Sequence, residues 1–172
     1  HVRYRVSAPE LRAPVEGDMN LVGGQARAEV GGVPAGSDRV FLVEAFDANF
    51  IRTFAAADTL VVEDPPQPVH LALDRLRGSL ELSAQLPPEI VELEVLVIAD
   101  GDTLSQTYEV EGVHEGRIIN IPTGTGVRVE LRGRDAQQQV LLLRELGADV
   151  RDDLVAHLAL GEYPQALEAA RS

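Results

Sequence analysis

The chain has 172 residues, no cysteine and a formal net charge of −13, with 28 acidic and 15 basic residues, and every basic residue is arginine. The missing cysteine excludes disulfides and thiolate metal sites, and the missing lysine excludes Schiff-base chemistry and a phosphate-loop lysine. So acidic a chain repels phosphate backbones and anionic membranes, so we expect neither nucleic-acid binding nor membrane insertion. No apolar run approaches the length that a membrane span needs.

The first half of the chain predicts a β-module with a weak beginning. Residues 2–7 alternate apolar residues with arginine, which is typical of a strand. Residues 8–18 contain Pro9, Pro14 and Gly17 and predict an extended spacer, so this first strand would lie on a proline-rich tether. Further strands are predicted at 21–22, 26–30, 39–46, 50–54, 59–63 and 69–76. Because the stretch before residue 30 is weak, we expect a first module, residues 1–77, that is short of a strand or two.

A stretch that the chain contains twice organises both halves. Val33-Pro34-Ala35-Gly36 and the strand after it return 88 positions later as Ile121-Pro122-Thr123-Gly124 and a second strand. Proline presets φ, and the glycine two residues later permits a positive φ, so the chain reverses before each strand. Residues 69–73 return 87 positions later as residues 156–160. A repeat of this length indicates two tandem modules of one fold.

The second module is predicted to be the more complete of the two. It covers residues 78–160, with strands expected at 79–86, 93–99, 104–111, 117–121, 127–133, 140–146 and 154–160. Seven short strands with turns between them indicate a sandwich. Residues 161–172 shift to helix formers and predict a short C-terminal helix. The predicted fold class is therefore all-β, with two tandem antiparallel immunoglobulin-like sandwiches and that helix.

The residues from Ile121 to Leu143 resemble those of a known type of module. An apolar-Pro-x-Gly turn, an alternating strand, an Asp-Ala turn and a further strand follow one another there. This order resembles the immunoglobulin-like and transthyretin-like modules of bacterial secreted proteins and lipoproteins. The resemblance implies a spacer, an adhesive module or an accessory binding domain.

Candidate chemical groups are few. Asp100 and Asp102 flank a glycine between two predicted strands, where they could contribute to a calcium site or form a hairpin turn. Calcium needs six or more oxygen ligands, so the turn is favoured and the two aspartates stay weak metal candidates. The four histidines lie far apart without a second ligand at metal spacing, and no nucleophile motif occurs. We therefore predict no enzyme, no catalytic residue and no cofactor.

Three functions remain open. The first is a structural or protein-binding module of a cell-surface assembly, outside the cytoplasm: extracellular, periplasmic or at the cell surface. The second is a filament subunit in which the first strand, with Val2, Tyr4 and Val6 on one face, is donated to a neighbouring copy. The third is an accessory carbohydrate- or calcium-binding domain of a secreted enzyme. The expected partner is another protein or a second copy of the chain.

Overall fold

The computed structural model describes residues 1–161, and the regular structure in that part is all β. This confirms the all-β fold class with several antiparallel sheets. The chain divides into two compact units, His1–Leu76 (unit 1) and Arg77–Ser172 (unit 2). Apart from Gly161, the predicted C-terminal helix lies outside the described residues. Within those residues no helix is long and apolar enough to cross a membrane.

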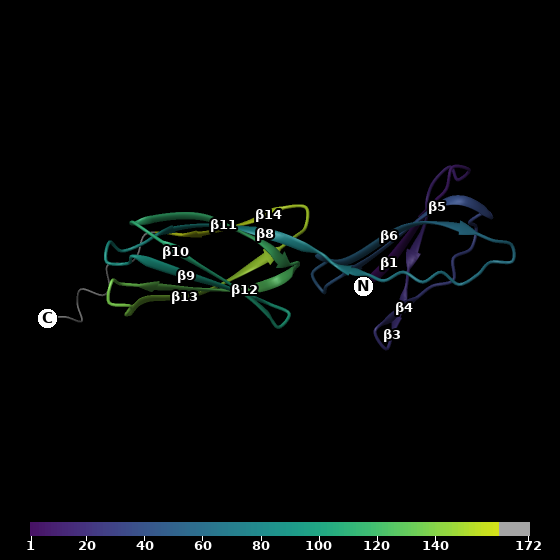
Figure 1. Ribbon diagram of the computed structural model, residues 1–172. Helices are drawn as coiled ribbons and strands as arrows, with labels where there is room; N and C mark the ends of the chain where they lie inside the picture. Colours follow the sequence, from purple (N-terminus) through teal and green to yellow (C-terminus); the bar gives the residue numbers. More distant parts are fainter. Residues whose placement is uncertain (162–172) are drawn as a thin grey trace. The chain divides into compact units, whose positions relative to one another are not determined.

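Unit 2 is a sandwich of two sheets. Its strands are β8 (Arg77–Gln85), β9 (Glu92–Ala99), β10 (Asp102–Glu109), β11 (Val113–Pro122), β12 (Gly124–Arg134), β13 (Val140–Val150) and β14 (Val155–Leu160). One sheet has the order β10-β9-β12-β13 and is antiparallel, and the other has the order β11-β8-β14. In the second sheet β14 runs parallel to β8, whereas β11 is antiparallel to it. Figure 1 shows the two layers.

The core of unit 2 lies between these two sheets. Alternate side chains of each strand point inward, and the most deeply buried include Leu80 and Leu82 of β8, Val95 of β9, and Val129 and Leu131 of β12. Burial of one such side chain stabilises a fold by roughly 1.5–3 kcal/mol. The central strand β8 therefore contributes much of what holds the second sheet against the first.

The outer face of the larger sheet of unit 2 carries a row of ion pairs. Glu130 accepts hydrogen bonds from Arg132 (2.7 Å) and from Arg128 (3.1 Å) on the same strand. These bonds, first that of Arg132 and then that of Arg128, hold the pKa of the Glu130 carboxyl below its ordinary value. Arg132 also lies 3.6 Å from Glu94 of β9. The charged residues that alternate with the apolar ones thus pair with each other on the solvent side.

Unit 1 has one large sheet. Its strands are β1 (Val2–Ser7), β2 (Val15–Asp18), β3 (Asn20–Val22), β4 (Gln25–Arg27), β5 (Gly36–Phe46), β6 (Arg52–Val62) and β7 (Asp74–Arg75). Five of them form a sheet in the order β2-β1-β5-β6-β7, and β3 and β4 form a separate hairpin. The predicted proline-rich spacer is therefore wrong at its end, because Val15–Asp18 turns back and pairs with β1. The predicted strands 50–54 and 59–63 both overlap the single strand β6.

Four strands of unit 1 repeat the larger sheet of unit 2. The order β2-β1-β5-β6 corresponds to β10-β9-β12-β13. Strands β5 and β6 have the same lengths as β12 and β13, and their residues correspond 88 positions apart, including the irregularities of register at both ends of the hairpin. The connecting turns are also alike: Asp47 Oδ1 accepts the backbone N–H groups of Asn49 and Ile51, and Asp135 Oδ1 accepts those of Gln137 and Gln139.

One inward position differs sharply between the two sheets. Arg39 of β5 is 2% exposed, and its equivalent in β12 is Val127. The Arg39 guanidinium donates hydrogen bonds to the backbone carbonyls of three residues in or beside the Pro-Ala-Gly turn: Pro34, Ala35 and Ser37. It also lies 3.1 Å from the half-exposed carboxylate of Glu10. Arg39 therefore fixes the turn that leads into β5.

Candidate functional site: the inner face of unit 1

The inner face of unit 1 is the side of its sheet on which the apolar residues gather. Register places on it Val2, Tyr4 and Val6 of β1, Phe41, Val43 and Ala45 of β5, and Phe54 and Ala56 of β6. Aromatic side chains of this size contribute most when they are fully buried. Yet Tyr4, Phe41 and Phe54 are only partly buried.

The side chains at the equivalent positions of unit 2 are buried. Val95 and Val129 are 0% exposed and Leu142 is 5% exposed, where unit 1 has Tyr4, Phe41 and Phe54. The backbone register is the same in both units, so the sheets themselves do not cause the difference. It arises from what covers each sheet. In unit 2 the cover is the three-stranded sheet β11-β8-β14.

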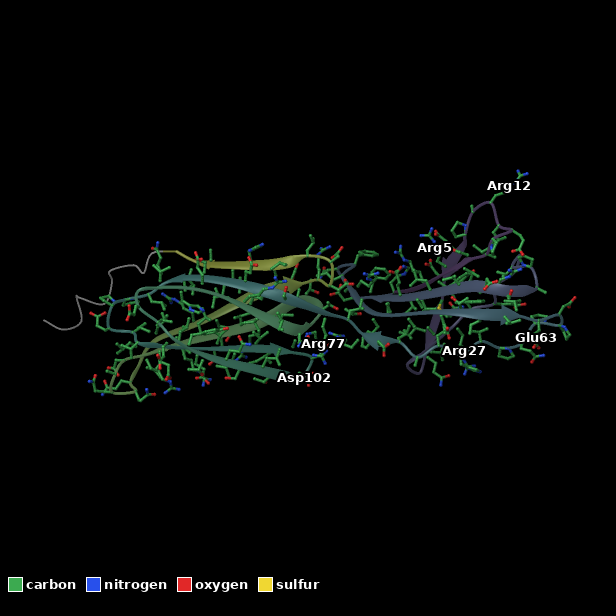
Figure 2. All side chains as sticks on the ribbon, turned by 45° about the horizontal axis from the view of Figure 1, so that its top comes forward. Arg5, Arg12, Arg27, Glu63, Arg77 and Asp102 are labelled. Carbon is green, nitrogen blue, oxygen red and sulfur yellow. The ribbon has the colours of Figure 1, made fainter. Side chains whose placement is uncertain are left out.

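Unit 1 contains counterparts of two of these three covering strands. Residues 25–34 stand where the repeat places β11, and residues 68–73 stand where it places β14. His70-Leu71-Ala72-Leu73 is identical to His157-Leu158-Ala159-Leu160, and in both copies the histidine and alanine are exposed while the leucines are partly buried. Figure 2 labels Arg27, the last residue of β4, and Glu63, the residue directly after β6. Arg27 lies within the first of the two segments, and Glu63 precedes the second in the sequence.

The counterpart of β8 is not among the strands of unit 1. In unit 2, β8 lies between β11 and β14 and pairs with both. In unit 1, residues 28–33 and 68–73 belong to no strand. A groove of about 330 Å³ lies beside the second of these segments and is lined by residues 60–63 and 67–70. By the repeat, a strand of the β8 type would lie between residues 28–33 and 68–73, and none of the described strands of unit 1 occupies that place.

The opposite face of the unit 1 sheet is polar. Glu44 is 7% exposed and accepts hydrogen bonds from Arg3 of β1 (2.9 Å) and Arg52 of β6 (2.6 Å). Burial opposes ionisation of Glu44, but the hydrogen bonds and charges of Arg52 and Arg3 outweigh it, so the pKa of this carboxyl is lowered. This cluster fixes three neighbouring strands and leaves the inner face as the apolar side.

The structure brings Val2, Tyr4 and Val6 together within their own unit. Strand β1 lies between β2 and β5, and Val2 and Val6 are 6% and 0% exposed. The ring of Tyr4 packs over Gly17 of β2, where a Cβ would come within 2.6 Å of the Tyr4 hydroxyl oxygen. Donation of this strand to another copy would require the chain to open both of its ladders, and it stays a prediction.

The two weak calcium candidates, Asp100 and Asp102, lie at a hairpin turn. Ala99 pairs with Asp102, so Asp100 and Gly101 are the two turn residues between β9 and β10, and both have positive φ (49° and 86°). Such angles are typical of the tightest hairpin turns. Across residues 1–161, no three His, Cys, Asp or Glu side chains are grouped so that they could hold a metal ion.

His114 is a titratable residue with a buried side chain in unit 2. It lies on β11, is 9% exposed, and has its ring 4.3 Å from the ring of Tyr108. Its Nε2 atom is buried and has no hydrogen-bond partner among the described residues. Burial lowers the pKa of His114, because the charged form cannot be solvated there.

We expect acid to destabilise unit 2 through His114. Because its pKa is lower in the folded state, the unfolded chain binds the proton more readily. The stabilising contribution of neutral His114 is complete above the ordinary pKa of about 6.5 and is lost as the pH falls below it. The free energies of opening of β8 and β11, obtained from hydrogen exchange in urea at pH 7.5 and at pH 5.5 relative to the intrinsic exchange rate at each pH, measure this loss. His114→Phe should remove it, whereas a fall of the same size in that variant would exclude His114 as the cause.

Sequence reasoning missed two parts of this site. It singled out neither Phe54 nor Arg39. The signal for an uncovered face was present in the repeat, since residues 69–73 match residues 156–160 while only the second copy is preceded by a strand like 79–86.

Comparisons with protein-family models, curated proteins and solved structures gave no significant match.

Proposed function

We propose that the chain is a non-enzymatic structural and protein-binding part of an assembly outside the cytoplasm. It consists of tandem β-modules, of which unit 2 is a closed sandwich and unit 1 offers an apolar face to another polypeptide segment. The observation that carries the proposal is a difference in burial between two sheets that have the same backbone register. The side chains at equivalent positions are fully buried in unit 2 (Val95, Val129) and only partly buried in unit 1 (Tyr4, Phe41).

The strand order of unit 2 bears on which kind of module this is. Counted within the unit, its sheets join strands 3-2-5-6 and 4-1-7. An immunoglobulin constant-type sandwich joins strands 1-2-5-4 and 3-6-7. The order therefore differs from that of the immunoglobulin constant type, and of the two resemblances we keep the transthyretin-like one. Modules of this kind occur in bacterial secreted proteins and lipoproteins, which supports a place outside the cytoplasm.

Cysteine labelling of intact cells tests this location. The chain has no cysteine, so Leu143→Cys, at a position 60% exposed on β13, introduces a single thiol. We expect a membrane-impermeant maleimide to label this variant in intact cells that produce the protein. Val95→Cys, at a fully buried position, is the matched control and should be labelled only after unfolding.

The outcome that would overturn the location is labelling of Leu143→Cys only after lysis.

Protein binding is tested separately with Phe50→Cys, at a position 72% exposed in unit 1, linked to a photoreactive maleimide. We expect covalent products of higher mass that contain a second surface polypeptide. A chain that is labelled on intact cells but never forms such products would be a spacer without a partner.

A further inference from the structure

We propose that unit 1 is completed by one additional β-strand of the β8 type, inserted between residues 28–33 and 68–73, and that this strand is joined to the amino-terminal side of β1. The inference rests on the proposed function and deepens it, because it assigns the polypeptide segment that covers the inner face to the same chain. It makes unit 1 a second closed sandwich with the same two sheets as unit 2.

The place of the strand is defined by its two neighbours. In unit 2, Leu82 of β8 pairs with Gly116 of the antiparallel β11 and with Leu158 of the parallel β14. The repeat gives Ala28 and Leu71 at these two positions of unit 1. An inserted strand would thus meet backbone groups on both of its edges, which is the way a strand is added to a sheet.

The chemistry of the strand follows from the residues that it must meet. The strand β8 turns Leu80, Leu82 and Ala84 toward the larger sheet, and they are 0%, 2% and 0% exposed. The inner face of unit 1 offers Tyr4, Phe41 and Phe54 at the positions of the buried residues beneath β8's sheet. An extended segment with apolar residues at alternate positions fits this face, and a charged residue at those positions would not.

The order of the repeat decides where the strand is attached. Strand β9 is the counterpart of β1, 91 positions later, because Leu93 pairs with Gly133 as Val2 pairs with Ala45. In unit 2, β8 stands directly before β9 and is joined to it by residues 86–91. The same order places the completing strand directly before β1. Short connections between consecutive strands of a module are the general rule.

A graft of β8 onto the full chain tests the proposal. Residues 77–91 are copied and joined to His1, which gives β1 the connection that β9 has in unit 2. We expect amide hydrogens of residues 28–33 and 68–73 to exchange at least about a hundred-fold more slowly than in the original chain. Hydrogen exchange followed by mass spectrometry resolves these segments from unit 2, which serves as the internal reference.

Two further arms make the result decisive. A graft with Leu80→Asp and Leu82→Asp in the added copy should give no protection, whereas one with Glu81→Gln in the added copy should protect fully. Unchanged exchange with the original graft, or equal protection by the Asp graft, would overturn the proposal. A free peptide of residues 77–86 that protects as well at micromolar concentration would overturn the attachment to β1 and indicate a strand from another molecule. Surface labelling of Leu143→Cys does not depend on any of these results.

Discussion

Deletion of residues 1–7 is expected to unfold unit 1 and to leave unit 2 folded. These residues include β1, which lies between β2 and β5 and buries Val2 and Val6. Each buried valine contributes roughly 1.5–3 kcal/mol, and the ladders on both edges of β1 are lost with it. A unit with so small a core cannot absorb this loss. Hydrogen exchange should show β5 and β6 unprotected and β9 and β12 unchanged.

The control for this deletion is Arg5→Ser, which changes an exposed residue of the same strand and keeps the backbone ladder. It should alter the exchange of β5 by little. If the deleted chain keeps β5 and β6 protected and loses only the ability to self-associate, our expectation is wrong and the strand-donation hypothesis for Val2, Tyr4 and Val6 gains its support.

Arg39→Ala is expected to lower the free energy of unfolding of unit 1 by about 2–4 kcal/mol. The side chain is buried and donates to the carbonyls of Pro34, Ala35 and Ser37, which would be left without this donor. Hydrogen exchange of β5 at increasing urea concentrations measures the change. The exchange of β12, whose equivalent residue is Val127, should not respond.

Glu10→Gln separates the hydrogen bonds of Arg39 from its ion pair. Glu10 is more than half exposed, so solvent screens its attraction to the guanidinium, and the substitution should cost less than about 1 kcal/mol. A loss as large as that of Arg39→Ala would mean that the ion pair, and not the turn carbonyls, accounts for the stabilisation.

The sequence predicted the hairpins well because their signals are local. The Pro-x-Gly turn, the alternation in the strand and the aspartate that starts the next turn lie within one short stretch, and the structure has β12 and β13 where the pattern placed strands. The two halves of β6 were separated because Ala55, Ala56, Ala57 and Asp58 interrupt the alternation, whereas the long partner β5 holds them in one ladder.

What the sequence could not predict depended on partners. Residues 69–76 have the pattern of a strand, yet only Asp74–Arg75 is one, because a strand requires a neighbour to pair with and no described strand pairs with residues 68–73. The same reason explains the error over residues 8–18, whose last part became β2 by pairing with β1. For the candidate site, alternation identified Val2, Tyr4 and Val6 as one face of a strand. It did not indicate how much of that face other segments cover.

The identical register of the two hairpins has a consequence for folding. Tandem modules of one topology can misassemble while the chain folds, when a strand of one module pairs with the partner of its counterpart. Here β12 could take the place of β5 beside β6 without any change in the backbone ladder. It would bring Val127 where Arg39 belongs, and the Glu10 carboxylate would lose its guanidinium partner. The hydrogen bonds of Arg39 to Pro34, Ala35 and Ser37 stay within its own segment, so the ion pair with Glu10 is the Arg39 contact that such a swapped pairing would lose.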